Sequence, residues 1–107
     1  MNKINTPENN KLIAIFDGQD SNLGLDYLCW ERVMPVWFKI LELDEINVLD
    51  ISKSEIGRNY VYLQLEGVTN GEWESKAIYN NKRNGDILST IYKTIVEFIL
   101  WYNELKK

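Results

Sequence analysis

The chain has 107 residues, 45% of them hydrophobic, and a formal net charge of −4. This length leaves room for one folded domain, and four tryptophans supply bulky side chains for its core. The negative charge disfavours general binding to nucleic acid or to anionic membranes, because such binding depends on clustered Lys and Arg.

The N-terminal residues are polar and rich in Asn, and we expect residues 1–10 to form a flexible arm. They contain no apolar stretch of the signal-peptide type. Residues 11–107 are then expected to fold as one α+β domain. Residues 11–16 are apolar on both faces and are followed by Asp17-Gly18, a pattern that predicts a short strand buried on both sides.

Residues 17–24 are rich in turn-forming residues and precede a helix that we predict over residues 26–43. The apolar residues of this helix recur at helical spacing and form one stripe: Trp30, Val33, Trp37, Ile40 and Leu41. Pro35 interrupts the pattern, so we expect a strained first turn followed by a regular helix.

Three strands are predicted next. The first covers residues 46–51, and the clearest covers residues 60–69, where apolar residues alternate with polar and aromatic ones. The alternating apolar positions are Val61, Leu63 and Leu65. Asn70-Gly71 is typical of a tight hairpin turn, so residues 72–79 are expected to return as an antiparallel strand.

Asp86 is placed to cap a final helix that ends near Leu105. Its apolar residues recur at steps of three and four: Ile91, Ile95, Phe98, Tyr102 and Leu105. The predicted order is therefore β-α-β-β-β-α, an α+β fold whose mostly antiparallel sheet has two helices packed on one face. The opposite face, with Tyr60 and Tyr62, is expected to be partly exposed to solvent.

The residue types that most often carry catalysis are missing. The chain contains no histidine, which removes the most common general base and metal ligand. Its one cysteine, Cys29, therefore lacks an imidazole partner, and one cysteine allows no internal disulfide, as is typical of a reducing cytoplasm. Asp17, Asp20 and Asp26 lack the spacing of a calcium-binding loop. We expect no enzymatic activity, cofactor or metal.

Three groups of residues are candidates for binding a partner. The first is the exposed sheet face with Tyr60, Tyr62 and Gln64, because exposed aromatic side chains are common in protein interfaces and base-stacking surfaces. The second is a basic group: Arg58, Lys76, Lys82 and Arg83. The third is an acidic group suited to a basic partner: Glu42, Asp44, Glu45, Glu72 and Glu74. The alternatives are a covered face in the first case and solvated charges in the other two.

Three segments resemble a group of small proteins carried by phages and mobile elements of Bacteroidota: residues 11–16, 30–40 and 91–103. The most specific parts are Met34-Pro35-Val36 and the ending Trp101-Tyr102-Asn103. That group has no established activity, so the resemblance implies only an accessory gene of a mobile element. By analogy, small acidic proteins from such elements are often inhibitors of host defence, including CRISPR effectors.

Two functions of different classes follow. The first is a non-catalytic, cytoplasmic protein that binds a larger host protein, with a CRISPR nuclease or its guide-RNA complex as the expected partner. The alternative is a small RNA-binding domain of the double-stranded-RNA-binding type, because residues 26–105 are predicted to follow the order α-β-β-β-α. The acidic composition counts against the alternative. The longest apolar stretch, residues 87–102, contains Lys93 and Glu97 and is too short to span a membrane.

Overall fold

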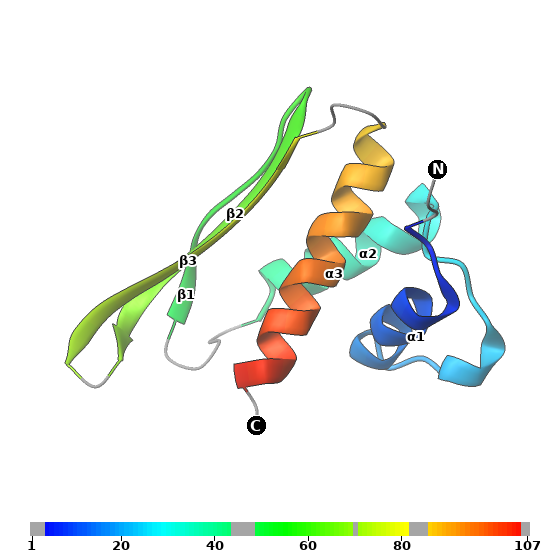
Figure 1. The fold of residues 1–107 in the computed structure, drawn as a ribbon, viewed down its shortest axis with the longest axis horizontal. Helices are drawn as coiled ribbons and strands as arrows, with labels where there is room; N and C mark the ends of the chain where they lie inside the picture. The colour runs from blue at the N-terminus through cyan, green and yellow to red at the C-terminus, as the bar shows by residue number, and fades with distance from the viewer. Residues whose placement is uncertain (1–3, 44–48, 70, 82–85, 106–107) are drawn as a thin grey trace.

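The structure is a computed structural model that describes residues 4–43, 49–69, 71–81 and 86–105. Its elements are α1 (Pro7–Phe16), the short 3-10 helix η1 (Ser21–Leu23), α2 (Trp30–Leu41), β1 (Leu49–Ile56), β2 (Tyr60–Thr69), β3 (Glu72–Asn81) and α3 (Ile87–Leu105). The strands form an antiparallel sheet in the order β1-β2-β3, and the helices lie on one side of it (Figure 1). The predicted α+β class is confirmed.

The first element is a helix and not the predicted strand. Residues 11–16 form the second half of α1, and residues 7–10, which were predicted to belong to a flexible arm, form its first half. Ile13 is buried whereas Ile15 is exposed, so this segment buries one side of a helix and not both faces of a strand.

The start of α1 is fixed by capping. The side chain of Thr6 accepts a hydrogen bond from the backbone N–H of Asn9. Pro7 occupies the first helical position, where a backbone N–H would have no partner within the helix. The side chain of Asn10 then connects α1 to the rest of the fold, because its oxygen accepts hydrogen bonds from the Tyr27 backbone N–H and the Tyr92 hydroxyl.

α2 begins at Trp30, later than the predicted start at Asp26. Asp26 instead forms a turn in which its carboxylate accepts a hydrogen bond from the backbone N–H of Leu28 at 3.0 Å. Pro35 lies inside the helix and does not end it.

The hairpin of β2 and β3 matches the sequence pattern closely. β2 has the predicted bounds, and its pairing with β3 runs in one register from Thr69 opposite Glu72 to Tyr60 opposite Asn81. Gly71 in the turn has a φ of 81°, a left-handed conformation that glycine adopts without strain.

β1 pairs with the other edge of β2 and extends beyond the predicted end at Ile51. A bulge interrupts its pairing between Ile51 and Lys53, where the Ser52 hydroxyl donates a hydrogen bond to the Gln64 carbonyl. Residues 46–48 of the predicted strand lie outside the described residues.

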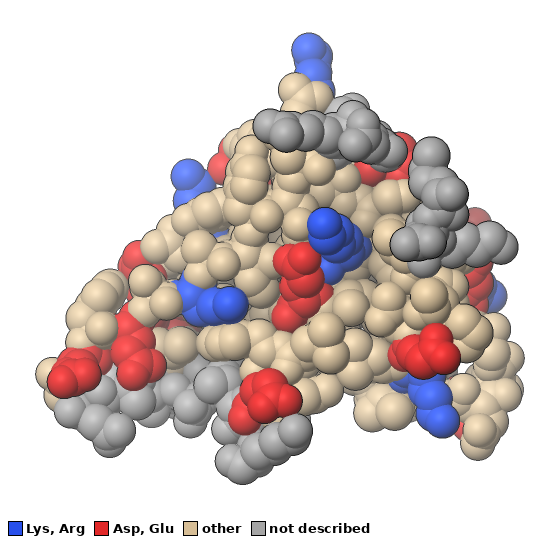
Figure 2. Space-filling model, viewed as in Figure 1, with Lys and Arg blue, Asp and Glu red and all other residues tan. Residues whose placement is uncertain are grey.

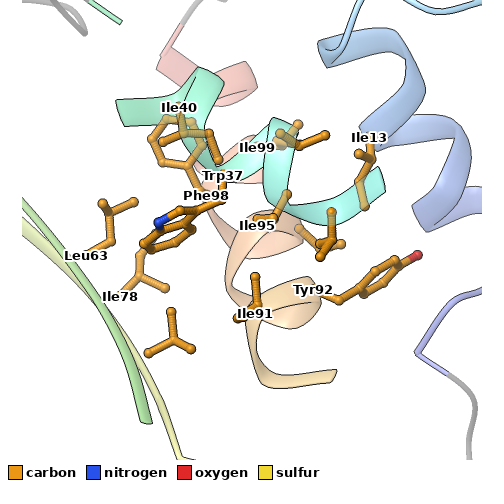
Figure 3. Close-up of a cluster of buried hydrophobic side chains, with 14 of the residues drawn as sticks. Ile13, Trp37, Ile40, Leu63, Ile78, Ile91, Tyr92, Ile95, Phe98 and Ile99 are labelled. Atoms are coloured by element: carbon orange, nitrogen blue, oxygen red, sulfur yellow. The ribbon is translucent and has the colours of Figure 1, made fainter. Parts of the chain in front are cut away.

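A hydrophobic cluster joins the sheet to the helices. Val61, Leu63 and Leu65 are fully buried, as their alternation predicts. Figure 3 shows the indole of Trp37 pointing from α2 toward the strands that carry Leu63 and Ile78. α3 contributes five fully buried residues to this cluster: Ile91, Tyr92, Ile95, Phe98 and Ile99. Trp30 departs from the predicted stripe, since it lies at the first position of α2 and is 49% exposed.

The tip of the β2–β3 hairpin extends beyond the helices. In Figure 1, α3 starts close to the end of β3 and diverges from the hairpin toward the C-terminus. The first residues of β3 are accordingly exposed on both faces of the sheet: Glu72, Trp73, Glu74 and Ser75. In the part of the chain that the structure describes, no helix has the length and apolarity needed to cross a membrane.

Candidate functional site: the open face of the sheet

The open face is the surface of the sheet opposite the helices. Because side chains alternate along a strand, the burial of Val61, Leu63 and Leu65 places their neighbours on this face. Strand pairing then assigns the other residues of this face: Asp50, Lys53, Glu55, Tyr60, Tyr62, Gln64, Glu66, Val68, Trp73, Ser75, Ala77, Tyr79 and Asn81. The structure therefore places Tyr60, Tyr62 and Gln64 together, as predicted.

Three tyrosines form an aromatic cluster on the open face: Tyr60, Tyr62 and Tyr79. The rings of Tyr60 and Tyr79 are stacked with centroids 5.8 Å apart, and Tyr62 meets Tyr79 edge-on at 6.3 Å. The second contact follows from the register, since Tyr62 and Tyr79 are cross-strand partners. Tyr79 is 55% exposed, so the aromatic cluster presents ring surface to solvent.

A second apolar area lies nearer the hairpin turn. Val68 and Trp73 are cross-strand partners and are 56% and 66% exposed. Together with the aromatic cluster they place several large apolar side chains on one side of the sheet. Tyr and Trp are enriched in protein interfaces and among the residues that dominate binding free energy.

Polar contacts hold the aromatic cluster in a fixed arrangement. The hydroxyl of Tyr60 donates to the Glu55 carboxylate, and the hydroxyl of Tyr62 donates to the side-chain oxygen of Gln64. The Lys53 ammonium lies 5.7 Å from the centroid of the Tyr62 ring and 3.7 Å from the Glu55 carboxylate. Rings that are already oriented lose less conformational entropy when a partner binds.

The neighbours of Tyr60 affect both the pKa of its phenol and the space available to its ring. Its hydrogen bond to Glu55 raises the pKa of the Tyr60 phenol, and partial burial and the nearby negative charge act in the same direction. The phenol therefore remains protonated and able to donate at neutral pH. Gly57 leaves space for the ring, because a Cβ at that position would overlap it.

The charged residues of the open face are mostly acidic. Asp50 lies opposite Glu66 across β1 and β2, and Glu55 lies closer to the aromatic cluster. Lys53 is the basic side chain that the structure places on this face. Figure 2 shows that the basic side chains on the visible side of the described chain are scattered. A mostly acidic face with few basic side chains does not favour binding to the phosphate backbone of a nucleic acid.

Of the predicted basic group, the two members that the structure describes, Arg58 and Lys76, lie apart. Arg58 lies in the turn between β1 and β2, at one end of the sheet. Lys76 pairs with the buried Leu65 and so lies on the helix-facing side, away from the aromatic cluster. Lys82 and Arg83 lie outside the described residues.

The predicted acidic group is also divided. Glu42 is exposed at the C-terminal end of α2. Glu72 and Glu74 are exposed near the tip of the hairpin, on β3. Asp44 and Glu45 fall in a segment that the structure does not describe.

The three aspartates around the first loop have structural partners. The carboxylate of Asp20 caps η1, and that of Asp26 accepts from the Leu28 backbone. Asp17 accepts a hydrogen bond from the Tyr27 hydroxyl. Among the described residues, no group of three or more acidic, His or Cys side chains is arranged to hold a metal ion.

Sequence reasoning left Tyr79, Trp73 and Val68 out of the binding site. A signal for them was present, because the two-residue turn at Asn70-Gly71 fixes the register of the hairpin and brings Tyr79 opposite Tyr62.

The chain matches no protein-family model, no curated protein and no solved structure.

Proposed function

We propose that this chain is a non-catalytic protein that acts by binding a larger protein through the open face of its sheet. The observation that carries the proposal is the aromatic cluster, which is exposed and at the same time oriented by Glu55, Gln64 and Lys53. Exposed tyrosines with a fixed orientation supply large contact areas at a low entropic cost.

The expected partner is a host defence protein, such as a CRISPR nuclease or its guide-RNA complex, and the chain would act as its inhibitor. The resemblance to small proteins of phages and mobile elements supports this assignment. The acidic residues of the open face, Asp50, Glu55 and Glu66, would complement a basic surface such as a nucleic-acid-binding groove. In this proposal Arg58 lies at the end of the interface next to Tyr60.

The proposal is tested with two matched double variants in a phage host that has an active CRISPR system. Tyr62→Thr/Tyr79→Thr removes part of the aromatic cluster while keeping residues that suit a strand. Phe38→Ala/Leu100→Ala removes apolar side chains that are similarly exposed, at 53% each, on the helices. Phage plating efficiency and copurification of the nuclease with the tagged chain are measured.

The wild-type chain and the helix variant should restore plating and copurify the nuclease, whereas the open-face variant should lose both effects. Equal activity of the two variants would contradict binding through the open face. A wild-type chain that gives no protection would contradict the assignment of a CRISPR partner.

The order of elements supports a second candidate, a small RNA-binding domain. From α2 to α3 the structure follows α-β-β-β-α with both helices on one side of the sheet, as in double-stranded-RNA-binding modules. The separation of Arg58 from Lys76 argues against it, because affinity for RNA depends on clustered basic residues.

A further inference from the structure

The two edges of the sheet differ. β1 carries a bulge between Ile51 and Lys53, and a bulge of this kind hinders the addition of another strand. β3 pairs with β2 over its 10 residues without a register shift. Its outer backbone groups form a regular edge, and an edge of this kind is able to pair with a further extended strand.

Two opposite charges lie next to each other on the helix-facing side of β3. Glu74 pairs with Gly67, and Lys76 pairs with Leu65, so both side chains follow the inward alternation of the core residues. Neither forms an ion pair within the described residues. Inward-pointing charges on an edge strand discourage pairing with arbitrary strands. Ser75 separates the two, so their order along the strand is complementary to itself when read in the opposite direction.

We propose that β3 pairs antiparallel with β3 of a second copy of this chain, with Ser75 of each copy opposite the other. In this register Glu74 lies opposite Lys76 of the second copy, and the twofold symmetry repeats the pair. Directly opposed side chains lie about 4.5–5.5 Å apart between their Cβ atoms, close enough for the charges to attract. The sheet then continues through both copies.

The residues on the open face fit the same register. Trp73 lies opposite Ala77 of the second copy, so this large side chain faces a small residue. The register that brings Lys76 against Lys76 is disfavoured, because like charges are then directly opposed. The opposite shift brings Glu74 against Glu74 but also Glu72 against Lys76 of the second copy. The double variant Glu74→Lys/Lys76→Glu separates this register from the proposed one, because it would leave only like charges opposed in the shifted register.

The helices leave room for this arrangement. α3 is attached to β3 at Asn80, whose side-chain amide donates to Thr94 and Glu97 at 2.9 Å and 3.0 Å. Along the joined strands the two copies of Asn80 would lie about 33 Å apart at ~3.3 Å per residue. This separation exceeds the ~10–12 Å diameter of a helix. The exposed start of β3, which projects beyond α3 in Figure 1, is the part that meets at the centre.

Charge reversal provides the test, with sedimentation equilibrium at low ionic strength as the measurement. Wild type should dimerise. Glu74→Lys and Lys76→Glu should each raise the dimer dissociation constant by about tenfold or more, because two attractive pairs become repulsive. An equimolar mixture of the two variants should form a heterodimer, since the lysines of one chain then face the glutamates of the other. The double variant Glu74→Lys/Lys76→Glu should dimerise like wild type.

Each alternative outcome overturns the proposal. A monomeric wild type would exclude the dimer, and single variants that dimerise like wild type would exclude the register. A mixture that remains monomeric would show that the two charges do not meet. Circular dichroism verifies that each variant is folded, and a failure of dimerisation would leave the binding of a partner by the open face untouched.

Discussion

Replacing Phe98 with alanine is expected to destabilise the fold strongly. The side chain is fully buried, and Figure 3 shows it among the core residues between the helices and the sheet. Its ring stacks on Tyr102 with centroids 5.6 Å apart and meets Phe16 edge-on at 6.2 Å. Truncation of a buried phenylalanine costs about 3–5 kcal/mol in total, and the loss of ring contacts, worth about 0.5–1.5 kcal/mol each beyond area burial, places Phe98 at the upper end of this range. We therefore expect a value near 5 kcal/mol, out of a total stability of roughly 5–15 kcal/mol.

Urea unfolding followed by far-UV circular dichroism measures this loss as a lower midpoint at an unchanged slope. Phe38→Ala is the matched control, because Phe38 is the same residue type on α2 but is half exposed, and we expect a loss below about 1 kcal/mol. If Phe98→Ala does not fold at all, Phe98→Leu, which keeps most of the volume, should fold with an intermediate midpoint. Equal midpoints for the two alanine variants would refute the placement of Phe98 in the core.

Three further predictions concern the N-terminal half and RNA. Asn10→Ala should cost about 1–3 kcal/mol, because the Tyr92 hydroxyl and the Tyr27 N–H lose their acceptor, and faster amide exchange at Tyr27 would report it. The hydrogen bond from the Leu28 N–H lowers the pKa of Asp26 below its ordinary value of 3.8. The ionised Asp26 carboxylate therefore stabilises the fold fully above its ordinary value, and this stabilisation is lost as the pH falls through the lower pKa of the folded state. Between neutral and acidic pH, Asp26→Asn should consequently lose less unfolding free energy than the wild-type chain loses. Double-stranded RNA should not be retained at about 0.15 M salt, and retention that Lys82→Ala/Arg83→Ala abolishes would favour the RNA-binding alternative.

The second half of the fold could be predicted from local signals. The Asn70-Gly71 turn and the alternation from Tyr60 to Leu65 define the hairpin, and each acts over a few residues without help from the rest of the chain. Asp86 likewise caps α3 through its hydrogen bond from the Ser89 N–H, as expected.

The first element could not be assigned from its apolar run. Six residues that are apolar on both faces fit a buried strand and a buried helix equally well, because so short a run does not reveal its period. The capping signal lay upstream, in Thr6 and Pro7, and identifies the helix. The polar second half of β1 was missed for a related reason, since an edge strand beside a solvent-exposed face needs few apolar residues.

The candidate site was predictable in part. Alternation places Tyr60 and Tyr62 on the open face, but the contribution of Trp73 depends on the register and on where the helices end. The side on which Lys76 lies is likewise set by its pairing with Leu65, and charge alone did not reveal it.

Photo-crosslinking in the host cell tests the central proposal most directly. A photoreactive phenylalanine analogue is placed at Tyr79 on the open face or, as the control, at Phe38 on α2, since the two sites are similarly exposed. Binding through the open face predicts a discrete adduct with a larger protein from position 79 and none from position 38. An adduct at twice the mass of the chain would report the dimer and is counted separately. The absence of a larger adduct at position 79, or the same adduct from both positions, would contradict the proposal.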